Sequence, residues 1–478
     1  MKTSFHSYDL LWLGIVLLIL LGIAMLLPLS PQDYWWYLRL GQDVMRSGSV
    51  PTVDTYSFTR AGSLFFYQSW LAAVIFWKTH QTGGLALTFL LRAVIIAATY
   101  SLLWVLARNA GAGARLASLL IVLAALAGSS NWSFRPQLFI YPLFVLTLLI
   151  LAKWMQGKSK ALWLLPALSM LWVNLHGSFP LLFVLAAFAF FFGKGNKKQL
   201  ALALALSAAA LFVNPHGAYV LGYVREMLSA PSNQQFSAEW MPMVNRGWQA
   251  NLFFFWLLVF APLAALSPRK LTLSDWAEFI FFGWLALLGI RYVIWFTFIM
   301  AILTASLLAE FGARYLDKPI GNEKPVINIF AACLLLLIPF SLLPGLRDSW
   351  WPGAPKAYDS ANPVLATEWL SAHPELAGPL WSDLAFSSYL IFAMPSRPVW
   401  IDTRFELYPP EQWEKYKAIA GASAQWESLL EEEKIQLVML STSGEPMLVS
   451  AMKDSTQWCE KYRDEDSVIF SRGTGGCQ

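Results

Sequence analysis

The chain has 478 residues, of which 57% are hydrophobic and only 13% are charged, and its mean hydropathy is +0.50. Soluble proteins carry about 25% charged residues, so this composition excludes an ordinary soluble enzyme. It indicates a polytopic membrane protein, for which we expect the lipid bilayer as a partner and no nucleic acid.

Charge is distributed unevenly along the chain. Residues 1–345 hold 23 Lys and Arg against 11 Asp and Glu, whereas residues 346–478 hold 11 against 19. This shift predicts a transmembrane domain over 1–345, with a first outer loop at 29–83, and a separate tail domain over 346–478. No small-residue cleavage site follows the first apolar run, Leu10–Leu27, so we expect that run to remain as a span.

Apolar runs that approach about 20 residues are typical of membrane-spanning helices. Such runs, several of them short, predict an α-helical polytopic membrane protein with about 11 transmembrane helices. The expected spans lie near 10–28, 84–107, 115–128, 136–153, 161–175, 178–193, 199–213, 251–267, 272–290, 292–312 and 326–345.

Basic residues fall in every second connection between the expected spans. With Lys2, these short segments hold 14 Lys and Arg, and the short connections between them hold few. Because short cytoplasmic segments are enriched in Lys and Arg, we expect a cytoplasmic N-terminus. The same bias predicts an outward-facing first loop and an extracytoplasmic tail domain.

This orientation places most polar clusters on the outer side of the membrane. They are Asp33–Trp70, Asn131–Pro136, Val173–Gly177, Val213–Gly217, Glu239-Trp240 and Arg291-Tyr292. The cytoplasmic segments are short and carry little besides Lys and Arg, and no glycine-rich phosphate loop follows a strand. An outward active site therefore needs a donor that arrives through the membrane, and a sugar linked to polyprenyl phosphate fits this requirement.

Sugar transfer from such a donor needs a base and a positive charge. A carboxylate removes the proton of the attacking hydroxyl or amine, and Asp33 is the expected base. The alternative is that Asp33 only caps the helix expected over Tyr34–Arg46, since Asp is a favoured cap. Asp54 is expected to be a turn residue.

The leaving phosphate needs cations to stabilise it, and Arg39, Arg135 and Arg291 are the candidates. Each of them could instead be an interfacial arginine near a helix end. Arg291 is the hardest to explain in that way, because it lies between two apolar spans where an unpaired charge is costly. Arg92 lies inside the second span and needs a partner in the bundle or a tilt toward the interface.

Further polar and aromatic side chains are expected to position the substrates. They are Gln68, Trp35, Trp36, Asn174, His176, His216, Glu239 and Tyr292. Asn174 and His176 belong to one copy of a repeated Val-Asn-x-His-Gly pattern, and His216 belongs to the other. Because Asn and His also bond free carbonyl groups where helices end, a structural role stays equally open. The aromatic stripe Tyr34–Tyr37 also fits an interfacial belt. We expect no cofactor, and a divalent metal stays an alternative that the sequence does not support.

The tail has the pattern of a small α/β domain. Helices are expected over Pro363–His373, Glu411–Ala418 and Gln425–Lys434, and strands over Gly378–Trp381, Ser388–Ala393, Val399–Asp402 and Ile435–Leu440. Cys459 and Cys477 either form a disulfide outside the cytoplasm or remain two thiols.

These motifs resemble those of one protein group. Asp33-Tyr-Trp-Trp-x-Leu-Arg-Leu-Gly41, Gly48–Thr59 and Gln68-x-Trp70 resemble the first outer loop of bacterial multi-span proteins related to the GT-C superfamily of glycosyltransferases. That superfamily includes the protein mannosyltransferases and the lipid A aminoarabinose transferases. Further matching pieces are Arg135-Pro-Gln137, Trp172–Gly177, Asn214–Gly217, Glu239-Trp240, Arg291, Ser387–Ile391 and Val399–Asp402 with Arg404 and Tyr408. The resemblance therefore covers most of the chain.

The resemblance implies a GT-C-like glycosyltransferase of the bacterial inner (plasma) membrane, with Asp33 as its base. It would transfer a sugar with inversion from a polyprenyl-phosphate donor to an unknown extracytoplasmic acceptor, which could be a protein, a lipid or a polysaccharide. The chain departs from the group at Gln32, where many GT-C enzymes have a second acid, and at Tyr67–Ser69, where the group often has His and Glu. A lipid-sugar flippase or transporter and a non-catalytic membrane assembly subunit are the alternatives.

Overall fold

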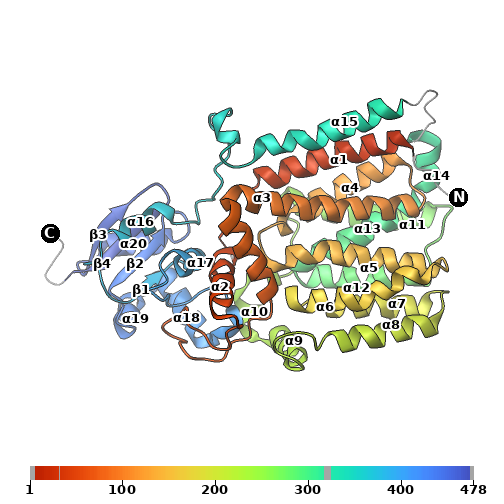
Figure 1. Ribbon diagram of the computed structural model, residues 1–478. Helices are drawn as coiled ribbons and strands as arrows, with labels where there is room; N and C mark the ends of the chain where they lie inside the picture. The colour runs from red at the N-terminus through yellow and green to blue at the C-terminus, as the bar shows by residue number, and fades with distance from the viewer. Residues whose placement is uncertain (1–5, 32, 317–323, 474–478) are drawn as a thin grey trace. The chain divides into compact units, whose positions relative to one another are not determined.

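The computed structural model describes residues 6–31, 33–316 and 324–473 (Figure 1). The chain forms two compact units. The first, here called the membrane unit, consists of Met1–Leu27, Thr79–Val220 and Ala238–Pro355. The second, here called the tail unit, consists of Pro28–Lys78, Leu221–Ser237 and Lys356–Gln478. The expected first loop thus groups with the C-terminal residues in one unit.

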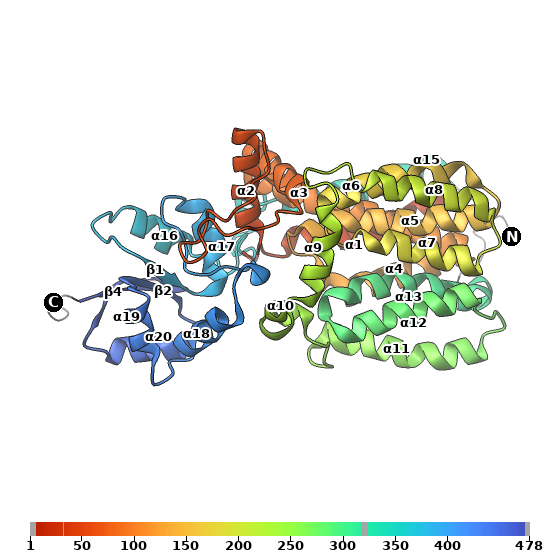
Figure 2. The ribbon, with the colours of Figure 1, turned by 90° about the horizontal axis from the view of Figure 1, so that it is seen from below.

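The membrane unit is built from helices that lie side by side (Figures 1 and 2). They are α1 (Ser7–Leu26), α3 (Trp70–Asn109, from Thr79 onward), α4 (Ala114–Gly128), α5 (Ile140–Met155), α6 (Leu165–Leu175), α7 (Pro180–Phe192), α8 (Lys197–Ala210), α11 (Trp248–Leu266), α12 (Leu273–Leu288), α13 (Val293–Leu307), α14 (Ala309–Phe311) and α15 (Pro325–Leu337). Almost every side chain of α13 is buried, as expected for a predominantly apolar helix at the centre of a bundle.

Each of the eleven expected spans coincides with a helix among the described residues, and the protein is a multi-pass membrane protein. In the part of the chain that the structure describes, seven stretches are long and apolar enough to cross a membrane: Ser7–Leu26, Trp70–Asn109, Ala114–Asn131, Pro136–Met155, Trp248–Leu266, Ile290–Leu307 and Pro325–Leu342. The helices α6, α7, α8 and α12 are shorter, so the count of 11 spans stays a prediction. A break at Gly83 and Gly84 divides α3, where Gly84 has φ +56°, a conformation that glycine adopts readily.

Arg92 has a structural partner inside the membrane unit. Its Nη2 donates hydrogen bonds to the carbonyl oxygens of Ala24 and Leu27, and Arg347 donates from Nη1 to the carbonyl of Met25 at 3.1 Å. These carbonyls belong to the C-terminal end of α1, where they have no partner within the helix. Two buried guanidinium groups therefore satisfy the end of α1 and complement its negative dipole end.

The tail unit contains a four-stranded sheet in the order β1-β2-β4-β3. The strands are β1 (Leu380–Ser382), β2 (Leu437–Ser441), β3 (Trp458–Arg463) and β4 (Ser467–Arg472). Strands β1 and β2 are parallel, with Trp381 opposite Val438, whereas β4 is antiparallel to both β2 and β3. The unit's helices are α2 (Tyr34–Ser47), α9 (Tyr219–Ser229, from Leu221 onward), α10 (Pro231–Phe236), α16 (Val364–Ser371), α17 (Leu384–Ala393), α18 (Pro410–Ala420), α19 (Trp426–Glu432) and α20 (Pro446–Asp454).

Helices cover both faces of this sheet, with α16 and α17 on one side and α18, α19 and α20 on the other (Figure 2). Alternate residues of β2 point to opposite faces. Val438 and Leu440 pack in one hydrophobic cluster, and Leu437 and Met439 pack in a second. The second cluster also contains Trp36, Leu40 and Tyr56 from the first loop. Loop and tail therefore share one hydrophobic core.

The predicted tail elements are confirmed except in two places. Ser388–Ala393 was expected to be a strand and is the second half of α17. A short apolar run is compatible with a buried strand or a helix, and here the Asp383 side chain accepts a hydrogen bond from Ala385 N at 2.8 Å and caps the helix. Val399–Asp402 forms no strand, although Val399 makes an isolated parallel bridge with Ser57. Cys459 takes part in a disulfide bond, and Cys477 lies outside the described residues.

Candidate active site

Asp33 stands directly before α2, but its side chain does not cap that helix. The backbone carbonyl accepts a hydrogen bond from Tyr37 N at 3.1 Å, and the side chain makes no capping bond. Its Oδ1 instead accepts hydrogen bonds from Thr403 Oγ1 at 2.6 Å and from Trp36 Nε1 at 3.3 Å. The half-buried carboxylate is thus oriented by a residue of the C-terminal segment, and the simple helix-cap interpretation is wrong for its side chain. Gln32 lies outside the described residues.

A second carboxyl group, Glu406, lies near Asp33, and sequence reasoning did not identify it. Glu406 accepts a hydrogen bond at Oε1 from the hydroxyl of Tyr223 at 3.4 Å. Burial raises the pKa of Glu406, and the carboxylate of Asp33 raises it further. Since Asp33 and Glu406 lie at opposite ends of the chain, no local pattern could connect them. The only available signal was the position of Glu406 between the motif residues Arg404 and Tyr408.

Thr403, which holds Asp33, is flanked by a buried ionic network. Arg404 donates from Nε and Nη2 to the two oxygens of Asp402 at 2.9 and 2.6 Å, and its Nη1 lies 2.7 Å from Asp54 Oδ1. The hydroxyl of Tyr67 accepts from Arg404 Nη1 at 3.0 Å. Although burial alone would lower it, the facing Asp402 carboxylate keeps the pKa of Arg404 raised. The buried guanidinium is thus paired and hydrogen-bonded, which offsets the cost of its burial.

Asp54 is a turn residue, as predicted, and also a partner of this network. Its oxygens accept hydrogen bonds from Tyr56 N at 3.0 Å, Ser57 N at 3.1 Å and Ser57 Oγ at 2.6 Å. The turn thus orients a buried carboxylate toward Arg404. The motif Asp54-x-x-Ser57 is explained by this contact between the first loop and the C-terminal segment.

The aromatic residues of the first loop are core residues of the tail unit. Trp35 is 2% exposed and donates from Nε1 to Asn362 Oδ1 at 2.7 Å. The backbone N–H of Trp36 donates to Ser388 Oγ at 3.2 Å. Gln68 is also buried, and its Oε1 accepts from Ser69 Oγ at 3.0 Å. Trp35 therefore anchors α2, whereas Trp36 also contacts Asp33 directly.

In the membrane unit, a separate cluster contains two of the predicted phosphate ligands. Arg135 forms an ion pair with Glu239. The guanidinium of Arg291 lies 4.6 Å from the ring centre of Trp240 and 6.0 Å from that of Tyr292. Among the described residues, no carboxylate pairs with Arg291. This cationic side chain is therefore stacked on an aromatic ring and keeps its hydrogen-bond donors available.

His176 belongs to the same cluster. Burial, followed by the charges of Arg291 and Arg135, lowers the pKa of His176 to about 3, so the imidazole is neutral at physiological pH. Its Nδ1 accepts a hydrogen bond from Ser178 N at 3.1 Å, which assigns the ring proton to Nε2. His176 can therefore donate a hydrogen bond from Nε2 beside two arginines.

The asparagines of the repeated pattern bond the backbone. Asn174 Nδ2 donates to the carbonyl oxygens of Met170 and Val213, both at 2.8 Å. Asn214 Oδ1 accepts from His216 N at 2.7 Å. Asn174 thus links the two copies of the pattern, which is the structural role left open by the sequence.

The predicted residues therefore fall into two groups. Asp33, Trp35, Trp36, Arg39 and Gln68 belong to the tail unit, and Asn174, Arg135, His176, His216, Glu239, Arg291 and Tyr292 belong to the membrane unit. Within the described part of the chain, no group of three or more His, Cys, Asp or Glu side chains could hold a metal ion.

No protein-family model and no curated protein sequence matches the chain. Solved structures do match it. The oligosaccharyltransferase AglB from Archaeoglobus fulgidus, in complex with an inhibitory peptide and a dolichol-phosphate, is 11% identical with a TM-score of 0.51, over 96% of this chain and 74% of that chain. ArnT from Cupriavidus metallidurans, bound to undecaprenyl phosphate, is 11% identical with a TM-score of 0.53, over 98% of both chains.

The arabinofuranosyltransferase AftD from Mycobacteria is 15% identical with a TM-score of 0.57, over 99% of this chain and 42% of that chain. At such low identity the similarity defines the fold alone. These three proteins are GT-C glycosyltransferases, and their similarity extends over both units of this chain. The chain therefore has the GT-C fold, as its motifs predict.

Proposed function

We propose that this protein is a membrane glycosyltransferase that transfers a sugar from a polyprenyl-phosphate donor to an acceptor outside the cytoplasm. The observation that carries the proposal is the Asp33 carboxylate, which is oriented by Thr403 Oγ1 at 2.6 Å and does not cap α2. In a chain of the GT-C fold, a carboxylate fixed in this way in the first loop is suited to act as a general base.

The proposed reaction is an inverting displacement at C1 of the sugar. An acceptor hydroxyl or amine attacks C1 while Asp33 takes its proton, and the bond from C1 to the phosphate oxygen breaks. The polyprenyl phosphate leaves with the electron pair of that bond. Two carboxyls near each other, Asp33 and Glu406, would face the acceptor, and the raised pKa of Glu406 favours its protonated form.

Arg291 and Arg135 are the proposed ligands of the donor phosphate. Arg291 has no carboxylate partner among the described residues. Its guanidinium stacks on Trp240 at 4.6 Å, so its N–H groups can bind an anion. A guanidinium binds phosphate through paired N–H donors. His176 would add one neutral donor from Nε2. The ArnT and AglB structures, solved with undecaprenyl phosphate and a dolichol-phosphate, support a lipid-linked donor.

The proposed location is the bacterial plasma membrane, with a cytoplasmic N-terminus and an extracytoplasmic tail. The distribution of Lys and Arg among the connections supports this orientation. The disulfide bond of Cys459 supports an oxidising compartment for the tail.

The test is a transfer assay with the purified full-length protein in nanodiscs, a panel of radiolabelled polyprenyl-phosphate sugars and an envelope extract as acceptor. Asp33→Asn keeps the size and shape of the side chain but removes the carboxylate that acts as the base, so we expect about 10²–10⁴-fold slower transfer. Binding of undecaprenyl phosphate is expected to be unchanged. The exposed Glu431→Gln serves as the control. Full transfer by Asp33→Asn would remove the proposed mechanism.

A further inference from the structure

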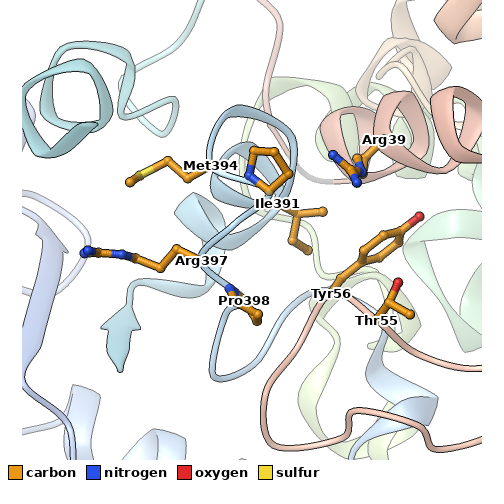
Figure 3. A pocket seen from close by; sticks show the side chains of 8 residues that line it. Arg39, Thr55, Tyr56, Ile391, Met394, Arg397 and Pro398 are labelled. Atoms are coloured by element: carbon orange, nitrogen blue, oxygen red, sulfur yellow. The ribbon is translucent and has the colours of Figure 1, made fainter. Parts of the chain in front are cut away.

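A small cavity lies in the tail unit, and the proposed reaction does not use it. Its volume is about 110 Å³, and its lining includes Arg39, Thr55, Tyr56, Ile391, Arg397 and Pro398 (Figure 3). Thr55 and Pro398 are exposed, so the cavity has a rim that faces solvent. Both the first loop and the C-terminal segment contribute to its wall.

Arg39 is held in place at one side of this cavity. Its Nε lies 3.0 Å from Asp43 Oδ2, and the same oxygen accepts a hydrogen bond from the hydroxyl of Tyr56 at 3.0 Å. Tyr56 is itself 6% exposed. One edge of the guanidinium is thus fixed by a buried tyrosine through a carboxylate, which limits the entropy lost when the other edge binds a ligand.

The remaining N–H groups of Arg39 face the cavity. Among the described residues, neither Nη1 nor Nη2 of Arg39 has an acceptor, and the Thr55 hydroxyl has no partner either. Figure 3 shows the Arg39 guanidinium extending from α2 toward Ile391 and the ring of Tyr56. The cavity therefore presents four N–H donors of a guanidinium and one hydroxyl to a molecule that enters it.

Arg397 adds a second positive charge. Its Nη2 donates to the carbonyl of Leu376 at 2.6 Å, and its Nη1 is buried without a hydrogen-bond partner among the described residues. Its guanidinium is turned away from Arg39 in Figure 3, so it acts on the cavity through its charge and its aliphatic stem. With Asp43 as the counter-charge of Arg39, one net positive charge remains around the cavity.

The size of the cavity restricts what it can hold. A water molecule takes about 30 Å³ of liquid volume, and sites for whole organic ligands measure about 300–1,000 Å³. A cavity of about 110 Å³ is smaller than such a site and suits one compact group of a molecule.

We propose that this cavity binds a compact oxyanion, a carboxylate or phosphate group, through the Nη1 and Nη2 atoms of Arg39. A guanidinium fork matches the two oxygens of such a group. The inference does not rest on the proposed sugar transfer, because Asp33, Arg135 and Arg291 take no part in it. The oxyanion belongs to a soluble molecule or to a lipid head group, which share this chemistry.

Thermal unfolding of the purified full-length protein in detergent tests the proposal. Inorganic phosphate replaces chloride at constant ionic strength, and a ligand that binds only the folded state raises the midpoint. We expect a saturable rise for the wild type and for Arg46→Gln, a matched control in which an exposed arginine of α2 is replaced. Arg39→Gln is expected to weaken the apparent affinity about tenfold or more.

Thr55→Val provides a second variant, because the exposed Thr55 has no hydrogen bond to lose among the described residues. It is expected to fold normally and to bind phosphate several-fold more weakly. An equal phosphate response in the wild type, Arg39→Gln and Thr55→Val overturns the proposal. A response that grows without saturation in all variants overturns it as well.

Acetate and farnesyl phosphate distinguish the two sources of the oxyanion. Responses to acetate and inorganic phosphate that need Arg39, without a response to farnesyl phosphate, assign the site to soluble anions. A response to farnesyl phosphate that needs Arg39 and occurs at lower concentrations assigns it to a lipid head group. If all three probes raise the midpoint equally in the wild type and in Arg39→Gln, the proposal is contradicted.

Discussion

Arg404 Nη1 lies 2.7 Å from Asp54 Oδ1, and both side chains are almost completely buried. The pair joins the first loop to the C-terminal segment within the tail unit. Because Thr403, the neighbour of Arg404, holds Asp33, this ion pair also determines where the proposed base stands. Folding of the unit and geometry of the site are therefore coupled through one arginine.

Asp54→Asn is expected to destabilise the protein strongly. Asp54→Asn breaks one of the two buried ion pairs of Arg404, which keeps only its pair with Asp402, and breaking a buried pair costs up to about 3–5 kcal/mol. The free energy of unfolding of the full-length protein in detergent is the measurement. Arg472→Gln is the control, because it breaks a partly exposed pair with Glu431 for which we expect a loss of at most about 1 kcal/mol. Equal losses in both variants would contradict a special role of the buried pair.

Thr403→Val is expected to slow transfer without weakening the fold to the same degree. The hydroxyl donates to the Asp33 carboxylate at 2.6 Å, and a hydrogen bond to a charged group contributes about 1.5–3 kcal/mol. We therefore expect a loss of about 10–100-fold in the rate of transfer at saturating donor.

Thr403→Ser keeps the hydroxyl and is expected to restore most of this rate. Donor binding should be unchanged in both variants, since Thr403 is proposed to orient the base and to touch no donor atom. A rate loss in Thr403→Ser as large as that in Thr403→Val would assign the effect to packing of the Thr methyl group.

Long apolar runs predicted the helices of the membrane unit correctly, because burial in a bilayer requires continuous apolar surface. Turn chemistry correctly predicted that Asp54 is a turn residue. The motif around Arg404 was identified from the sequence, but its structural role was not. The role of Arg404 depends on its ion pair with Asp54, which is far away in the sequence, and no local pattern indicates such a contact. For the same reason Glu406 was missed, although it lies near Asp33.

The error at Ser388–Ala393 has a different origin. The segment is short and apolar, and burial on a sheet face stabilises a helix or a strand of that composition equally well. The deciding feature is the Asp383 cap, whose Oδ1 accepts from Ala385 N at 2.8 Å. Asp is a favoured N-cap residue, so Asp383 before the run is the local signal that favours a helix.

The stability of the tail unit should fall as the pH rises from about 4.5 to about 7. Burial and the neighbouring Asp383 raise the pKa of Glu445 to about 7, against an ordinary value of 4.5. Between these two pH values the folded state keeps a proton that the unfolded state has released. The resulting contribution to the free energy of unfolding is complete below pH 4.5 and lost above pH 7. The midpoint of thermal unfolding of Glu445→Gln should be close to that of the wild type at pH 4.5 and higher than that of the wild type at pH 8. A difference in midpoint that is independent of pH would contradict this assignment.

Arg291→Gln should weaken the binding of undecaprenyl phosphate about 10–100-fold, because a charge-assisted pair of hydrogen bonds to the phosphate is lost. Arg291→Lys should lie between this variant and the wild type, since Lys keeps the charge but not the planar fork or the stacking on Trp240. Binding of radiolabelled lipid to the protein in nanodiscs is the measurement. Arg314→Gln is a matched control, because Arg314 lies over the ring of Tyr315 at 5.3 Å in the same way. If Arg314→Gln and Arg291→Gln weaken binding equally, the lipid responds to overall charge, and Arg291 is not the phosphate ligand.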